Sequence, residues 1–157
     1  MVSDEVLKEE LRAVTSRRGM KVAAYLRKLI SEALELRRRG IYAPKALADA
    51  RVQYILKALN FIYVPAELIP EPNEGDLRKV REYGVKLGKT LKNLGINVGE
   101  VIKYLGEQTG TIIHEEGKII VKPETGSKKL TTELIKGIAT GAELKIIKDK
   151  EIFIAKE

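Results

Sequence analysis

Clustered arginines are the residues of this chain whose type and spacing most directly suggest chemistry. Between residues 12 and 57 there are twelve cations and three anions, a net charge of +9, and this window holds eight of the ten arginines. An arginine side chain is a planar fork of five N–H donors that grips a phosphate group at two points. Their concentration in one stretch of the chain indicates an electrostatic footprint for nucleic acid, either DNA or RNA.

Ten of the twelve cations in this window are candidate nucleic-acid-binding residues. They are Arg17, Arg18, Lys21, Arg27, Lys28, Arg37, Arg38, Arg39, Lys45 and Arg51. Tyr25, Tyr42 and Tyr54 lie among them and could stack on bases or form hydrogen bonds. The same pattern fits a second interpretation, in which the tyrosines lie at the edge of a core and the arginines pair with acidic residues of a partner subunit.

Residue types that usually carry catalysis are sparse. The chain has no cysteine, and His114 is its one histidine, so a thiolate nucleophile, a disulfide and a Cys/His metal site lack their parts. The carboxylate pairs Glu9-Glu10 and Glu115-Glu116 are interpreted as solvated charges. The glycine-rich phosphate loop, the dinucleotide-binding motif and the nucleophile elbow are missing. We therefore expect no enzyme, no metal and no cofactor.

Three helices are predicted to carry the basic window. Apolar residues recur at helical spacing in a first helix with Ser3 as its N-cap and Gly19 as its stop, and in a second helix that ends at Gly40. The third helix is expected to run from Pro44 to Pro65. Three of the five prolines lie between residues 65 and 75, which is typical of a domain boundary. The expected organisation is a helical basic region (1–66), a linker (67–75) and an α+β domain (76–157).

The second half combines helices with two hairpins. Asp76 is expected to cap a helix in which Gly84 and Gly88 lie one turn apart, a costly arrangement that predicts close approach of another backbone. A short helix should follow from Asn97 to Gly110. The alternating patterns predict hairpins at 111–122 and 143–156, separated by a helix capped by Thr131. Because an isolated hairpin is marginally stable, both should join one antiparallel sheet packed with helices, which gives an α+β fold.

Two stretches resemble known families. Residues 16–36, SRRGMKVAAYLRKLISEALEL, are similar to the helical part of ribbon-helix-helix repressors. Those repressors read bases with a strand before the first helix, but here only Met1 and Val2 precede the cap, so the resemblance implies a helical hairpin alone.

Residues 77–156 resemble vinyl-reductase-type small-ligand domains and the related vesicle-tethering subunits. The likeness lies in the helix with Gly84 and Gly88, the helix that ends at Gly110, the two hairpins and the segment ELIKGIA at 133–139. It implies this topology and a domain that binds a small ligand or a partner. The cysteine pattern of the family is absent, so no metal or redox role carries over.

Composition limits where such a protein works. Its 157 residues suit one or two small domains, and an abundance of Lys, Arg and Glu with only two Gln favours a hyperthermophilic, archaeal-like source. The longest apolar runs are shorter than a membrane span, and the first residues, MVSDEVLKEE, do not have the pattern of a signal peptide. We expect a soluble cytoplasmic protein.

The favoured hypothesis is a non-enzymatic, nucleic-acid-associated regulator. Its Arg-rich helices would bind the phosphate backbone, and its carboxy-terminal domain would bind a ligand or partner. The alternative is an assembly subunit of a larger complex whose arginines meet an acidic protein. Because three amphipathic helices form only a thin core, we also expect a homodimer through the second and third helices.

Overall fold

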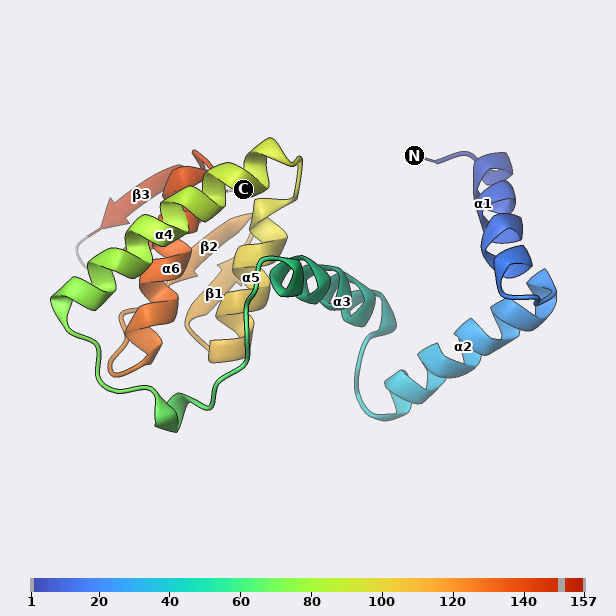
Figure 1. Ribbon diagram of the computed structural model, residues 1–157, viewed down its shortest axis with the longest axis horizontal. Helices are drawn as coiled ribbons and strands as arrows, with labels where there is room; N and C mark the ends of the chain where they lie inside the picture. The colour runs from blue at the N-terminus through green and yellow to red at the C-terminus, as the bar shows by residue number, and fades with distance from the viewer. Residues whose placement is uncertain (1, 150–151, 157) are drawn as a thin grey trace. The chain divides into compact units, whose positions relative to one another are not determined.

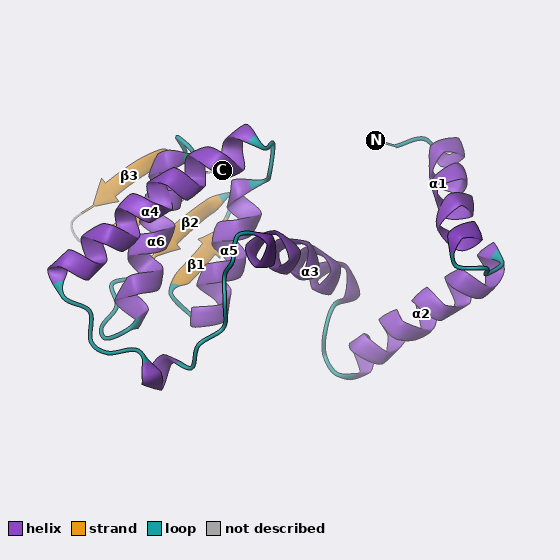
Figure 2. Ribbon diagram, viewed as in Figure 1, coloured by secondary structure: helices purple, strands orange, loops and turns teal. Residues whose placement is uncertain are grey.

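Helices and one sheet make up the computed structural model, which describes residues 2–149 and 152–156. Within that part there are six α-helices, one short 3-10 helix η1 (Ala66–Leu68) and a four-stranded antiparallel sheet (Figure 2). The strands all follow the fifth α-helix along the chain. The fold is therefore α+β with a helical amino-terminal half, as the sequence predicts.

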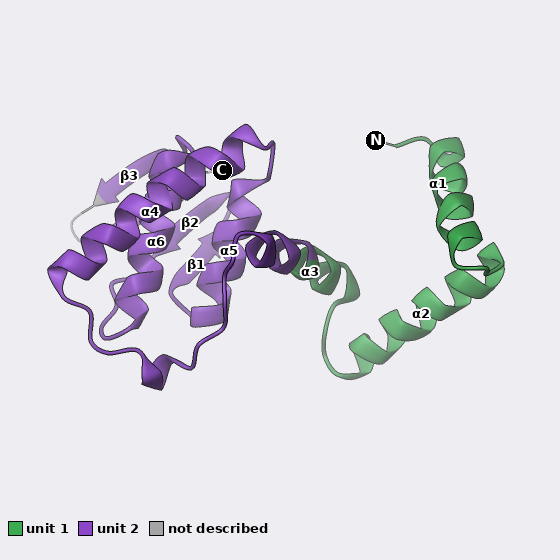
Figure 3. Ribbon diagram, viewed as in Figure 1, with its two compact units in different colours: residues 1–50 green, residues 51–157 purple. Residues whose placement is uncertain are grey.

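The chain divides into two compact units after residue 50 (Figure 3). The first holds α1 (Asp4–Arg17), α2 (Val22–Arg38) and the start of α3 (Ala43–Ala58). The Ser3 hydroxyl accepts a hydrogen bond of 3.4 Å from the backbone N–H of Val6, so its prediction as the N-cap of α1 is confirmed. Of residues 2–50, Thr15 alone is buried. The first unit thus has almost no core of its own.

The division lies within α3 and not at the expected linker of residues 67–75. The segment before α4 (Glu74–Asn93) belongs to the second unit, to which aromatic contacts tie it. The Phe61 ring centroid lies 6.4 Å from that of Tyr83, and the hydroxyls of Tyr63 and Tyr104 are 2.7 Å apart.

The ends of three helices differ from the expected ones. α3 ends at Ala58 rather than near Pro65, because Asn60 adopts a left-handed φ of 62°. Asn73, not Asp76, caps α4: its side chain accepts the N–H of Asp76 at 2.9 Å, while the Asp76 carboxylate accepts the N–H of Asn73 at 3.1 Å. The cap predicted at Thr131 is also wrong, since α6 (Lys128–Gly141) begins one turn earlier. For α5 (Val98–Thr109), both expected caps are confirmed.

Backbone contact between α4 and α6 explains the helical glycines. A Cβ built on Gly84 would lie 2.6 Å from the carbonyl oxygen of Leu134 and 3.0 Å from the Cα of Gly137. A Cβ on Gly88 would collide with the carbonyl oxygen of Ile138, and one on Gly141 with that of Val85. The close approach of another backbone predicted at Gly84 and Gly88 is therefore confirmed, and α6 contributes glycines to the same contact.

Both hairpins join one sheet, as expected. The strands are β1 (Ile112–Glu115), β2 (Lys118–Val121), β3 (Lys145–Asp149) and β4 (Ile152–Lys156), in the order β1-β2-β4-β3. In Figure 1 the helices α4, α5 and α6 lie on one side of this sheet. Alternate residues of β2 and β4 are buried in the core with them: Ile119, Val121, Phe153 and Ala155.

A row of isoleucines crosses the opposite face of the sheet. The strand register pairs Ile113 with Ile120, Ile120 with Ile154 and Ile154 with Ile147. The outer two remain accessible, with Ile113 44% and Ile147 38% exposed. Cross-strand neighbours of this kind stabilise a sheet by contact with one another.

Candidate nucleic-acid interface

All ten candidate phosphate-binding side chains are exposed in the structure. Nine of them belong to the first unit and Arg51 belongs to the second. Helix α2 and its two caps, Lys21 and Arg39, supply six of the nine. The basic window is therefore centred on one helix.

The cations of α2 occupy more than one face of the helix. Residues 7 or 11 positions apart return to nearly the same face of an α-helix, so Lys21, Lys28 and Arg39 share one side. Arg27 and Arg38 share an adjacent side for the same reason. Arg37 lies about 100° around the helix from Arg38 and extends the apolar stripe instead. Two neighbouring basic rows thus run along the polar side of α2.

Acidic neighbours engage a minority of these cations. Glu35 accepts a hydrogen bond from Arg38 and one from Arg39, each 3.3 Å long, and both arginine side chains stay more than two-thirds exposed. Exposed pairs of this type contribute little to stability. The other cations of α1 and α2 in the candidate set have no ion pair with any described residue: Arg17, Arg18, Lys21, Arg27, Lys28 and Arg37.

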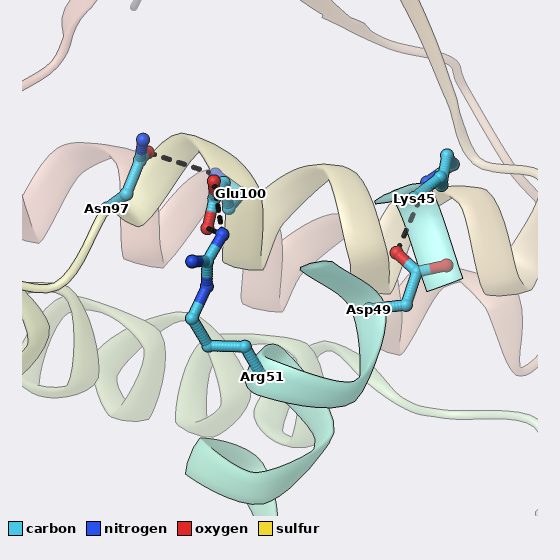
Figure 4. Close-up of polar contacts among 5 residues, drawn as sticks. All are labelled: Lys45, Asp49, Arg51, Asn97 and Glu100. Atoms are coloured by element: carbon cyan, nitrogen blue, oxygen red, sulfur yellow. Dashed lines mark hydrogen bonds and ion pairs between the residues drawn. The ribbon is translucent and has the colours of Figure 1, made fainter. Parts of the chain in front are cut away.

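Helix α3 places its two candidate cations in internal ion pairs (Figure 4). Lys45 donates a hydrogen bond of 3.2 Å to Asp49, one turn away in the first unit. Within the second unit, the Nη2 group of Arg51 contacts both carboxylate oxygens of Glu100, at 3.1 and 3.2 Å. The backbone N–H of Glu100 donates a hydrogen bond of 3.2 Å to the side chain of Asn97, the N-cap of α5. Arg51 is thus held by α5 rather than grouped with the cations of α2.

Large apolar side chains of the first unit are also exposed. On α2, Leu29 is 46% exposed, Ile30 60% and Leu34 47%, and on α1 Leu7 is 50% exposed. A helix normally buries such a stripe against another element. The first unit therefore presents both a basic and an apolar face to solvent.

A basic cavity in the second unit was not predicted from the sequence. Its volume is about 470 Å³. Its lining includes five cations and two carboxylates, which come from helices α4 and α6, the loop after β2, and the β3–β4 hairpin. The cations are Arg81, Lys122, Lys129, Lys136 and Lys148. They are spread over nearly 70 positions of the sequence with no common spacing. Only the apposition of α4, α6 and the hairpin brings them together, so no local pattern could have revealed them.

Other features of the described residues do not add a site. No group of three or more His, Asp or Glu side chains among them could hold a metal ion, and His114 lies exposed on β1. None of their helices is both long and apolar enough to cross a membrane. Comparisons with protein-family models, with curated proteins and with solved structures found no match.

Proposed function

We propose that the chain is a nucleic-acid-associated regulator. In this proposal the cations of α1 and α2 bind the phosphate backbone, and the second unit binds a ligand or partner. One observation carries it: six exposed cations between Arg17 and Arg37 have no counter-ion among the described residues. Had the basic charge served internal stability, these side chains would pair with acids of the chain, as Arg51 does with Glu100.

Phosphate contacts would give affinity without base recognition. Neither α1 nor α2 is preceded by a strand in the described residues, so direct reading of base edges has no evident element there. Arg38 and Arg39 could exchange the exposed carboxylate of Glu35 for phosphate oxygens at small cost. The expected binding is therefore strongly dependent on salt and weakly dependent on sequence.

A salt-dependent titration on duplex DNA and on RNA tests the proposal. If Arg37, Arg38 and Arg39 each neutralise one phosphate of duplex DNA, replacing all three by Ala should flatten the plot of log affinity against log salt by about 2.7. The matched control replaces the exposed Lys79, Lys86 and Lys89 of α4 by Ala, which removes the same charge from the second unit. Equal flattening by both variants, or no binding of the unaltered protein at low salt, would contradict the proposal.

The uncovered apolar stripe supports a separate proposal, self-association of the chain through α2 and α3. We expect a homodimer in which the stripe of α2 lies against its copy, because a two-fold interface covers the same patch on both chains. Light scattering at micromolar concentration should give twice the mass of the chain, and Ile30→Glu should give a single-chain mass. Leu94→Glu, at a position 66% exposed in the second unit, is the control. A single-chain mass for the unaltered protein would exclude the homodimer.

A further inference from the structure

Two lysines that line the basic cavity, Lys122 and Lys148, lie at one end of the sheet. Val121, Phe153 and Lys148 lie side by side across β2, β4 and β3, and Lys122 directly follows Val121. Lys122 and Lys148 are thus about 10 Å apart at the backbone, two strand spacings, and flexible side chains can close that distance. Neither has an ion pair with a described residue, although both line the cavity.

Glu133 holds two more cations at the helical wall of the cavity. Its carboxylate accepts a hydrogen bond of 2.6 Å from the Nε of Arg81 on α4 and one of 3.2 Å from Lys136 on α6. The Glu133 side chain is only 14% exposed. A recessed carboxylate with two cationic partners fixes their positions, while their remaining N–H donors stay available.

The cavity also has an apolar part. Leu77 of α4 and the hairpin residues Ile152 and Phe153 contribute to the lining, next to the hydroxyl-bearing Thr132 and Thr140. Its volume of about 470 Å³ is in the range of small-molecule sites, which combine apolar walls with a few placed polar groups. Counting all lining residues, the charge is +3.

We propose that this cavity binds a small organic ligand carrying a diphosphate or a similarly compact group with several negative charges. Lys122 and Lys148 would hold that group from the sheet side, while Arg81 and Lys136, positioned by Glu133, hold it from the helix side. The ligand's apolar portion would lie against Ile152 and Leu77. This inference names the ligand class for the second unit and rests on that part of the proposed function.

A small ligand is favoured over a nucleic-acid strand because carboxylates lie within the cavity. Glu124 and Glu133 line it, and a continuous chain of phosphates would have to pass close to both. A compact anion places fewer negative charges near these carboxylates.

Calorimetric titration of the 157-residue chain with inorganic pyrophosphate at physiological salt tests this site. We expect Lys122→Gln and Lys148→Gln each to weaken binding about tenfold, as for loss of a hydrogen bond to a charged group. Glu133→Gln should instead tighten binding, since it removes a negative charge from the wall and keeps an acceptor oxygen that can still position Arg81 and Lys136. A stabilising role alone could not produce these opposite signs in one cavity.

The other end of the same sheet offers a matched control. Lys118 and Lys145 both pair with Lys156 in the strand register, so Lys118→Gln with Lys145→Gln removes two charges from the sheet outside the cavity. This variant should bind pyrophosphate within about twofold of the unaltered protein. Equal weakening by the control, or no heat of binding at millimolar pyrophosphate, would overturn the proposed site.

The nucleic-acid titration separates this failure from failure of the proposed function. If the cavity is specific for a small ligand, Lys122→Gln with Lys148→Gln leaves the salt slope on duplex DNA unchanged. A loss of DNA binding as large as that caused by the triple change at Arg37, Arg38 and Arg39 would instead assign the cavity to nucleic acid and refute the small-ligand proposal.

Discussion

Replacing Gly88 by Ala tests the backbone contact between α4 and α6. The added Cβ would meet backbone atoms of α6, among them the carbonyl carbon of Ile138 and the nitrogen of Ala142, each at 2.9 Å. Ordinary contacts need about 0.5 Å more. Backbone atoms inside a helix cannot move individually, so the two helices must separate. That separation also loosens the packing of the buried side chains of Leu87 and Leu91.

The expected net effect of Gly88→Ala is a loss of about 2 kcal/mol in the free energy of unfolding. Overpacking of a core costs up to about 3 kcal/mol, and the better helix propensity of Ala offsets about 1 kcal/mol of that. For a chain of this size the melting temperature should fall by about 4–8 °C. Urea unfolding followed by circular dichroism measures the change, with exposed Lys79→Ala on the same helix as control. A Gly88→Ala protein as stable as the unaltered one would refute backbone contact here.

Two further perturbations address single interactions of the second unit. The hydrogen bond from Lys92, 2.5 Å long, and the charges of Lys92 and Lys89 lower the pKa of Glu143 below its usual 4.5. Because the folded-state pKa is lowered, the ionised Glu143 stabilises the folded protein at pH values above the unfolded-state pKa. Glu143→Gln should therefore reduce the melting temperature at pH 7, and the difference in melting temperature between the two proteins should vanish as the pH falls through the folded-state pKa. A difference that grew in acid would contradict this. Asn73→Ala removes the cap of α4 and should cost about 1 kcal/mol in urea unfolding, whereas no loss would mean that water replaces the cap.

Local signals in the sequence were sufficient for much of the fold. Ser3 and Asn97 cap helices where their side chains can accept an N–H near the start of an apolar stripe, and Gly110 ends α5 because it takes a left-handed φ of 67°. The glycine pair of α4 correctly predicted the close approach of another backbone. These features depend on residues within a few positions of one another, which is why a pattern can reveal them.

Features that depend on distant or competing residues were harder to predict. Asp76 is a good N-cap by type, but Asn73 competes for the same role and both together form a capping box. Asn60 ended α3 although apolar residues continued the helical period beyond it. Exposure of the ten candidate cations is compatible with the sequence hypothesis, whereas the capture of Arg51 by Glu100 depends on a residue 49 positions away. The basic cavity likewise depends on residues that are far apart in the sequence.

The strands that carry the isoleucine row can aggregate when the protein unfolds. Short segments such as KIIV and IFIAK combine β-branched or aromatic residues with little charge, the composition that forms intermolecular cross-β structure. In the folded sheet they are kept from such pairing because β2 and β4 are interior strands, while the edge strands β1 and β3 are short and β3 carries Lys145 and Lys148. Native topology therefore places KIIV and IFIAK where no edge is open, and loss of an edge strand would expose one of them as a template for fibre growth.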